Sequence, residues 1–126
     1  MSALPKTPIP MPVHEVENVL AFRTPVGAVT INAGENRLLG TVEVSMFDKI
    51  RLVTDERIDS TANIVLRLTI TEGDELVAQL DTVTLTPNSQ LTRVYDVPGR
   101  TIGVYADAVG PAGSKAGLDV LIYGQY

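Results

Sequence analysis

The sequence predicts an all-β fold: a jelly-roll or related Greek-key β-sandwich of about eight strands, preceded by an extended N-terminal arm. From residue 26 onward, apolar and polar residues alternate with a period of two, and turn residues interrupt the alternation roughly every 8 to 12 positions. No segment beyond residue 26 has a convincing 3.6-residue period. An immunoglobulin-like sandwich is the second choice, because the cysteine and tryptophan landmarks of that fold are absent.

The length and the first 25 residues set the expected domain organisation. At 126 residues the chain suits one domain with a two-layer core. We assign residues 1–25 to the arm and residues 26–126 to the sandwich. Within residues 14–22 (HEVENVLAF), the apolar positions permit either a short helix or an irregular strand, and we favour the extended form.

The alternation in the sandwich divides into eight expected strands. The clearest is NIVLRLTIT, in which every second residue from Ile64 to Ile70 is apolar. Turn residues such as those in TPNS and VPGR separate the strands. The expected strands are 26–33, 38–46, 49–54, 63–71, 76–85, 90–97, 101–108 and 118–123.

The strand expected at 76–85 changes phase partway along its length. Its first apolar residues occupy even positions, whereas Val83 and Leu85 occupy odd positions. A β-bulge near Asp81 and Thr82 would restore the register. Strands that bend in this way often pass between the two sheets of a sandwich.

The arm contains the stretch LPKTPIPMPV (4–13), in which four prolines are interspersed with apolar residues. Proline lacks the amide hydrogen that a central strand or a helix interior needs, and it favours an extended backbone. A preset extended backbone lowers the ordering entropy when a segment docks on a surface. We therefore expect this segment to dock on a neighbouring copy, with the apolar anchors Leu4, Ile9, Met11 and Val13.

Three outward-facing residues on the last two strands are candidates for the receiving surface. The alternation predicts that Tyr105, Leu121 and Tyr123 point away from the core. Such residues favour a surface covered by another chain segment, and ordinary cross-strand pairing of half-buried tyrosines is an equally good interpretation. A small stacking platform for carbohydrate is a further interpretation, although the chain has no tryptophan.

Acidic residues gather in TDERIDS and TEGDE, where they offer weak candidates for Ca²⁺ ligands. Neither stretch has the spacing of a dedicated calcium loop, so solvated turns explain both better and no metal is expected. The residues concerned are Asp55, Glu56 and Asp59 in the first stretch and Glu72, Asp74 and Glu75 in the second.

Several functional classes are disfavoured. The net charge of −5 argues against nucleic acid as a partner. No catalytic or nucleotide-binding motif occurs, and the single histidine, His14, has no nucleophile placed beside it, so we expect neither catalytic residues nor a cofactor. No long apolar run and no secretory signal are found, so we expect no membrane insertion and synthesis in the cytoplasm, with release to a cell, spore or virion surface.

The C-terminal segment VPGRTIGVYADAVGPAGSKAGLDVLIYGQY (97–126) resembles small single-domain β-sandwich proteins of spore-forming bacteria. In outline these are similar to the jelly-roll subunits of endospore appendages, which link through N-terminal extensions inserted into neighbouring subunits. The resemblance implies a structural, self-assembling subunit of a filament, fibre or surface layer. Those subunits use cysteines for cross-links, and this chain has none, so linkage here would be non-covalent. The alternatives are a module that binds carbohydrate or another surface polymer, and a viral decoration or fibre protein.

Overall fold

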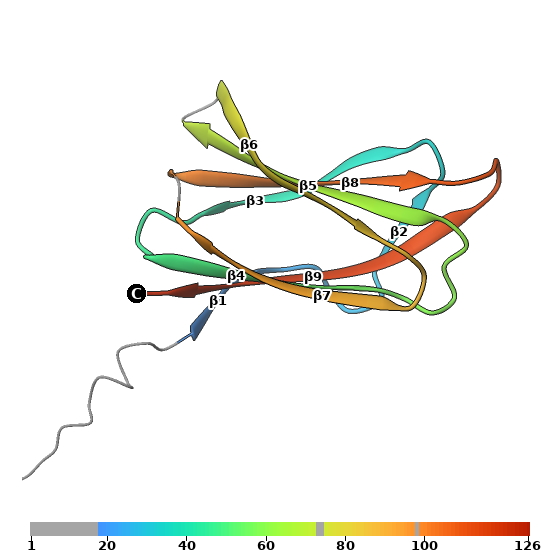
Figure 1. The fold of residues 1–126 in the computed structure, drawn as a ribbon, viewed down its shortest axis with the longest axis horizontal. Coiled ribbons are helices and arrows are strands. Elements are labelled where there is room, and N and C mark those ends of the chain that lie inside the picture. The colour runs from blue at the N-terminus through green and yellow to red at the C-terminus, as the bar shows by residue number, and fades with distance from the viewer. Residues whose placement is uncertain (1–17, 73–74, 98) are drawn as a thin grey trace, which may run out of the picture.

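The computed structural model describes residues 18–72, 75–97 and 99–126. These residues form two antiparallel sheets that pack face to face, which confirms the predicted β-sandwich (Figure 1). They contain no helix, and hence none long and apolar enough to cross a membrane. The strands are β1 (Asn18–Arg23), β2 (Val29–Asn32), β3 (Asn36–Glu43), β4 (Lys49–Glu56), β5 (Asn63–Glu72), β6 (Glu75–Leu85), β7 (Ser89–Asp96), β8 (Thr101–Val109) and β9 (Lys115–Gln125).

The strand order is that of a jelly roll. Antiparallel pairs join β5 to β6, β4 to β7, β3 to β8 and β2 to β9, so the chain is one long hairpin with the β5–β6 turn at its tip. Rolling this hairpin brings β9 beside β4 and β8 beside β5. The result is sheet A, with the order β1-β9-β4-β7 and β2 also paired to β9, and sheet B, with the order β3-β8-β5-β6.

The first strand of the jelly roll is split into β1 and β2, which both pair with β9. Between them, Thr24 keeps its place in the ladder: its amide donates to the Val120 carbonyl at 3.0 Å, and its hydroxyl accepts from the Val120 amide at 3.1 Å. The chain then turns at residues 25–28, and the Gly27 amide donates to Asp119. The sandwich therefore includes residues 18–25, which the sequence analysis placed in the arm.

The expected strands agree with the observed ones, with differences at their ends. The strand expected at 26–33 is only β2, because the turn at 25–28 delays it, and β9 is longer than the expected 118–123. The part of 14–22 that the structure describes is extended, as β1. The predicted bulge in β6 is present at Leu80, where Asp81 pairs with Leu68 and Gln79 with Thr69.

Alternate residues of both sheets fill the core. On β9 the inward positions run from Ala116 through Leu118, Val120 and Ile122 to Gly124, and the apolar side chains among them are fully buried. Phe47 closes one end of the core by lying directly on Gly124, where a side chain would leave no room for its ring.

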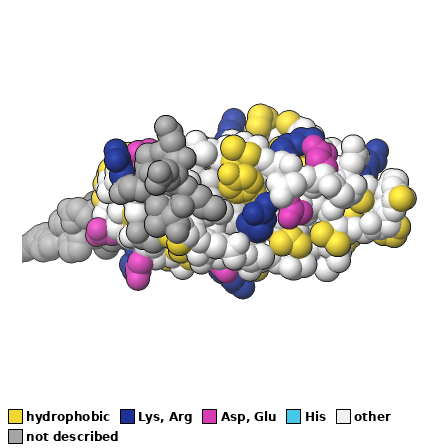
Figure 2. Space-filling model, turned by 90° about the horizontal axis from the view of Figure 1, so that it is seen from above, with side chains coloured by type: hydrophobic (Ala, Val, Ile, Leu, Met, Phe, Trp, Pro, Cys, Tyr) yellow, Lys and Arg dark blue, Asp and Glu magenta, His cyan; other side chains and the backbone are white. Residues whose placement is uncertain are grey.

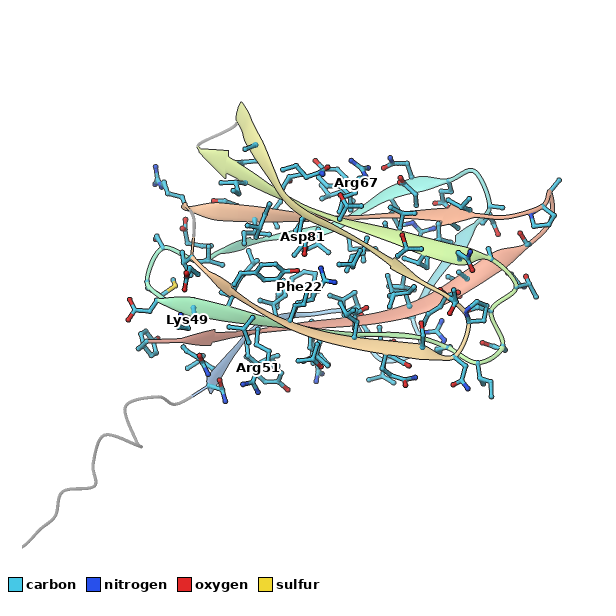
Figure 3. The ribbon with its side chains drawn as sticks, viewed as in Figure 1. Phe22, Lys49, Arg51, Arg67 and Asp81 are labelled. Atoms are coloured by element: carbon cyan, nitrogen blue, oxygen red, sulfur yellow. The ribbon has the colours of Figure 1, made fainter. Side chains whose placement is uncertain are left out.

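Two side-chain contacts close the lateral seams between the sheets. On the seam between β1 and β3, Phe22 lies so close to Gly40 that an added Cβ would be 2.6 Å from its ring. On the seam between β6 and β7, the bulge turns Asp81 inward, and its carboxylate accepts from Tyr95 at 2.6 Å and from Arg93 at 2.8 Å. Figure 3 shows Phe22 and Asp81 between the two layers.

Candidate interaction surface

The outer face of sheet A carries an apolar area with an arginine in its middle. The register places Leu20, Tyr123, Arg51 and Val94 in one row across β1, β9, β4 and β7. The next row contains Leu121 and Val53. We call these six residues the central patch: Leu20, Arg51, Val53, Val94, Leu121 and Tyr123. Leu20 and Val94 are 45% and 51% exposed, and the other four are half-buried.

The polar side chains at the two ends of this face are paired with one another. At one end Lys49 forms an ion pair with Asp96 at 2.6 Å. At the other end Gln90 donates to Asp55 at 2.7 Å, and Arg57 forms an ion pair with Asp119 at 3.1 Å. The charged and polar side chains in these pairs already have hydrogen-bond or ion-pair partners, whereas Arg51 in the middle of the face has none among the described residues.

Arg51 makes no hydrogen bond or ion pair with any other described residue, and the same holds for Arg23, which is exposed beside Leu121 on the edge strand β1. The Nε of Arg51 is inaccessible to solvent and has no acceptor. Figure 3 shows Arg51 on the outer side of sheet A, away from the core. A guanidinium among apolar and aromatic side chains is typical of the centre of protein interfaces, where Arg and Tyr are enriched.

The outer face of sheet B has a different chemistry. Arg67 lies 5.1 Å from the centre of the Tyr105 ring and forms an ion pair with the Asp107 carboxylate at 3.5 Å, which Arg51 lacks. The Arg67 Nε, like that of Arg51, is inaccessible to solvent and has no hydrogen-bond partner among the described residues. Thr82 lies opposite Arg67, and the exposed Leu38 lies opposite Tyr105, so this face also carries an apolar side chain beside its arginine and tyrosine. Figure 2 views the molecule from this side and shows basic and acidic side chains in contact with one another.

The structure separates the three residues that the sequence suggested as one receiving surface. Leu121 and Tyr123 lie together in the central patch, whereas Tyr105 lies on the outer face of sheet B, on the opposite side of the sandwich. A single surface or a stacking platform that combines Tyr105 with Tyr123 is therefore not formed. Alternation within a strand predicted correctly that each side chain faces outward, but it could not tell which sheet each strand joins.

The suggested arm anchors Leu4, Ile9, Met11 and Val13 lie outside the described residues, as does His14. Of the second acidic stretch, Asp74 also lies outside them. The role of the arm therefore remains a prediction from the sequence.

The first acidic stretch does not come together as a metal site. Asp55 faces outward on β4, Glu56 faces into the core, and Asp59 is exposed in the following loop. Within the part of the chain that the structure describes, no group of three or more His, Cys, Asp or Glu side chains is placed to hold a metal ion.

Glu56 is the unexpected member of this stretch. Its side chain is fully buried, and neither carboxylate oxygen has a hydrogen-bond partner among the described residues. Burial raises the pKa of Glu56 to about 7, while the nearby Ser60 hydroxyl and Ile64 amide oppose that rise by smaller amounts.

A polar cavity of about 120 Å³ lies beside the loop that follows β4. Its arginine, Arg57, lies flat on Gly117 and already donates to the Val29 carbonyl at 2.6 Å as well as to Asp119. The cavity is smaller than the roughly 300–1,000 Å³ typical of small-molecule sites. Because the Arg57 guanidinium already donates hydrogen bonds to Val29 and Asp119, we infer that its role is structural. It holds the loop after β4 against β2 and β9.

The sequence pattern alone did not point to Arg51 as a surface residue of interest. The alternation around it, with Ile50 and Leu52 inward, implies that Arg51 faces outward. Its position beside Tyr123 depends on the pairing of β4 with β9, which are far apart in the chain. The central patch is therefore the candidate functional surface that the fold adds to the sequence. No known protein family matches this chain, and no curated protein is significantly similar to it.

Proposed function

We propose that the protein is a structural subunit of a filament, fibre or surface layer, which self-associates when its N-terminal arm docks non-covalently on a neighbouring copy. The observation that carries the proposal is that residues 18–126 supply a complete jelly roll with a filled core. The apolar anchors of the arm are therefore not needed inside the sandwich, and an external surface is the place where they would be buried.

A feature of the described surface supports this proposal over a ligand-binding or catalytic role. The described residues present a contiguous apolar area, the central patch, on the sheet to which β1 belongs. Exposed apolar patches of this kind mark partner surfaces in small soluble proteins. The contact is heterologous, because an arm on one copy meets a different surface on the next, so repetition gives a ring or a filament.

The test compares two full-length variants of the arm. Ile9→Asp with Met11→Asp places charges at two anchors, whereas Ser2→Asp with Thr7→Asp adds the same charge at positions that are not anchors. Size-exclusion chromatography with light scattering and negative-stain microscopy then report assembly, and circular dichroism reports folding. We expect the first variant to be a folded monomer and the second to assemble like the unchanged protein. A monomeric unchanged protein, or an anchor variant that assembles normally, would overturn the proposal.

A further inference from the structure

We propose that the central patch is the acceptor surface for the arm of a second copy, and that Arg51 pairs there with a carboxylate of that arm, Glu15 or Glu17. This inference rests on the proposed function and deepens it, because it names the surface on which the arm docks.

The patch requires a partner that is apolar and carries a negative charge. Arg51 lies between Tyr123 and Val94 and has no carboxylate beside it among the described side chains, whereas Lys49 and Arg57 at the ends of the same face are paired. Arg23, on the edge strand β1 beside Leu121, is a second arginine of this face without an ion pair among the described residues. An uncompensated guanidinium in a surface that becomes buried would be costly, so the occupant must bring a counter-charge. An occupant with only apolar side chains does not fit.

The arm has this composition. In the stretch IPMPVHEVE, the apolar residues Ile9, Met11 and Val13 and the acidic residues Glu15 and Glu17 all occupy odd positions. An extended backbone would present these five side chains on one side. The arm therefore offers three apolar anchors followed by two carboxylates, which matches an apolar patch that contains Arg51 and has Arg23 beside it.

The described chain begins at the rim of the same sheet. Asn18 pairs with Gln125 at the end of β9, so the arm leaves from the end of sheet A. To cover the patch of its own copy, the chain would have to reverse direction just before Asn18. The preceding residues, VHEVE (13–17), include no Gly, Pro, Asn or Asp, which are the usual turn residues. If the chain continues extended before Asn18, it points away from the patch of its own copy, and 17 extended residues span up to about 55 Å.

The experiment mixes two full-length variants that each lack one half of the contact. The arm variant carries Ile9→Asp and Met11→Asp and keeps its patch. The patch variant carries Arg51→Glu and keeps its arm. We expect each to be monomeric alone and the mixture to form dimers but no larger species, because a single arm-to-patch contact can then form. Light scattering measures the masses, and titration of one variant into the other gives the Kd.

Two controls separate charge complementarity from general damage. Thr84→Glu adds a negative charge to the outer face of sheet B and should assemble like the unchanged protein. Arg51→Glu should weaken assembly about 30-fold or more, as loss of a buried charge pair does. Combining Arg51→Glu with Glu15→Lys and Glu17→Lys in one chain should restore assembly, because the charges are exchanged.

The outcomes distinguish this inference from the proposed function. If the unchanged protein is monomeric, both fail. If the anchor variant loses assembly but Arg51→Glu does not, self-association through the arm stands and the central patch is not its acceptor. If both variants are monomeric and their mixture forms no dimer, or if the exchanged charges fail to restore assembly, the pairing of arm and patch is also overturned.

Discussion

Glu56 lies at the end of β4 with its carboxylate inside the apolar core, opposite the end that Phe47 closes. A carboxyl group in such a place is more stable when protonated, because its ionised form loses hydration, and the nearby Ser60 hydroxyl and Ile64 amide compensate for only part of that loss. The pKa of Glu56 therefore rises from an ordinary value near 4.5 to about 7. This single residue couples the stability of the fold to pH.

The direction of the coupling follows from proton binding. Between about pH 4.5 and pH 7, folded Glu56 holds its proton and unfolded Glu56 does not, so the free energy of unfolding decreases as the pH rises through this window. A difference of this size between the two pKa values corresponds to roughly 3 kcal/mol. The lowered pKa of Asp81, which results mainly from its hydrogen bond with Tyr95, affects stability only at more acidic pH.

We expect Glu56→Gln to remove most of this pH dependence. The neutral amide has nearly the shape of the protonated carboxyl group, so the variant should be more stable than the unchanged protein at pH 8 and similar to it at pH 5. Urea unfolding at a series of pH values measures the effect, and Glu43→Gln, at an exposed position, is the matched control. A Glu56→Gln variant with the same pH slope as the unchanged protein would show that Glu56 is ionised in the core.

Among the strands, β6 does more than pair with β5, because the bulge at Leu80 allows it to contact the other sheet. It places Asp81 on the inner side of sheet B, from which the carboxylate reaches Tyr95 and Arg93 on β7 of sheet A. Burial, together with the neighbouring Asp81 carboxylate, raises the pKa of Tyr95, so its hydroxyl remains a donor. The bulge thereby links the two sheets along an open side of the sandwich.

Removing the Tyr95 hydroxyl should weaken this seam without changing the fold. We expect Tyr95→Phe to lower the free energy of unfolding by about 1.5 kcal/mol, as for a hydrogen bond to a charged group. Tyr105→Phe is the control, because the Tyr105 ring contacts Arg67 through its face and should lose little. Urea unfolding with an unchanged m-value is the measurement. Equal losses in both variants would contradict a special role for the Asp81 contact.

Local sequence patterns predicted where most of the strands lie, but not which strands pair with one another. The phase change in residues 76–85 predicted a bulge close to its observed place, and the alternation in β9 identified its outward side chains. The break between β1 and β2 was not predicted. At this break the Thr24 hydroxyl accepts the hydrogen bond of the Val120 amide in place of a backbone carbonyl, and such a substitution does not change the apolar–polar alternation of the sequence. The burial of Glu56 was missed too, since a charged residue after a strand ordinarily marks a solvated turn.

At the scale of the whole molecule, the jelly roll gives the two sheets unlike outer faces. On the outer face of sheet B, Arg67 lies over the Tyr105 ring and forms an ion pair with Asp107. The face of sheet A has an apolar centre with Arg51 unpaired among the described residues. Pairings between strands distant in the chain create this asymmetry, which is why the sequence suggested Tyr105 and Tyr123 as one surface although they lie on opposite sides.

The contact on which assembly depends, in this proposal, is that between the arm of one copy and sheet A of another. Because the chain has no cysteine, single introduced cysteines can report that contact cleanly. One full-length variant would carry Met11→Cys, a second Val53→Cys in the central patch, and a third Thr84→Cys on the outer face of sheet B.

Mild oxidation of mixtures, followed by non-reducing electrophoresis with one partner tagged, measures cross-linking between copies. We predict that Met11→Cys forms a disulfide-linked dimer with Val53→Cys and little or none with Thr84→Cys. Equal cross-linking to both positions, or none to Val53→Cys under conditions in which the protein assembles, would contradict the claim.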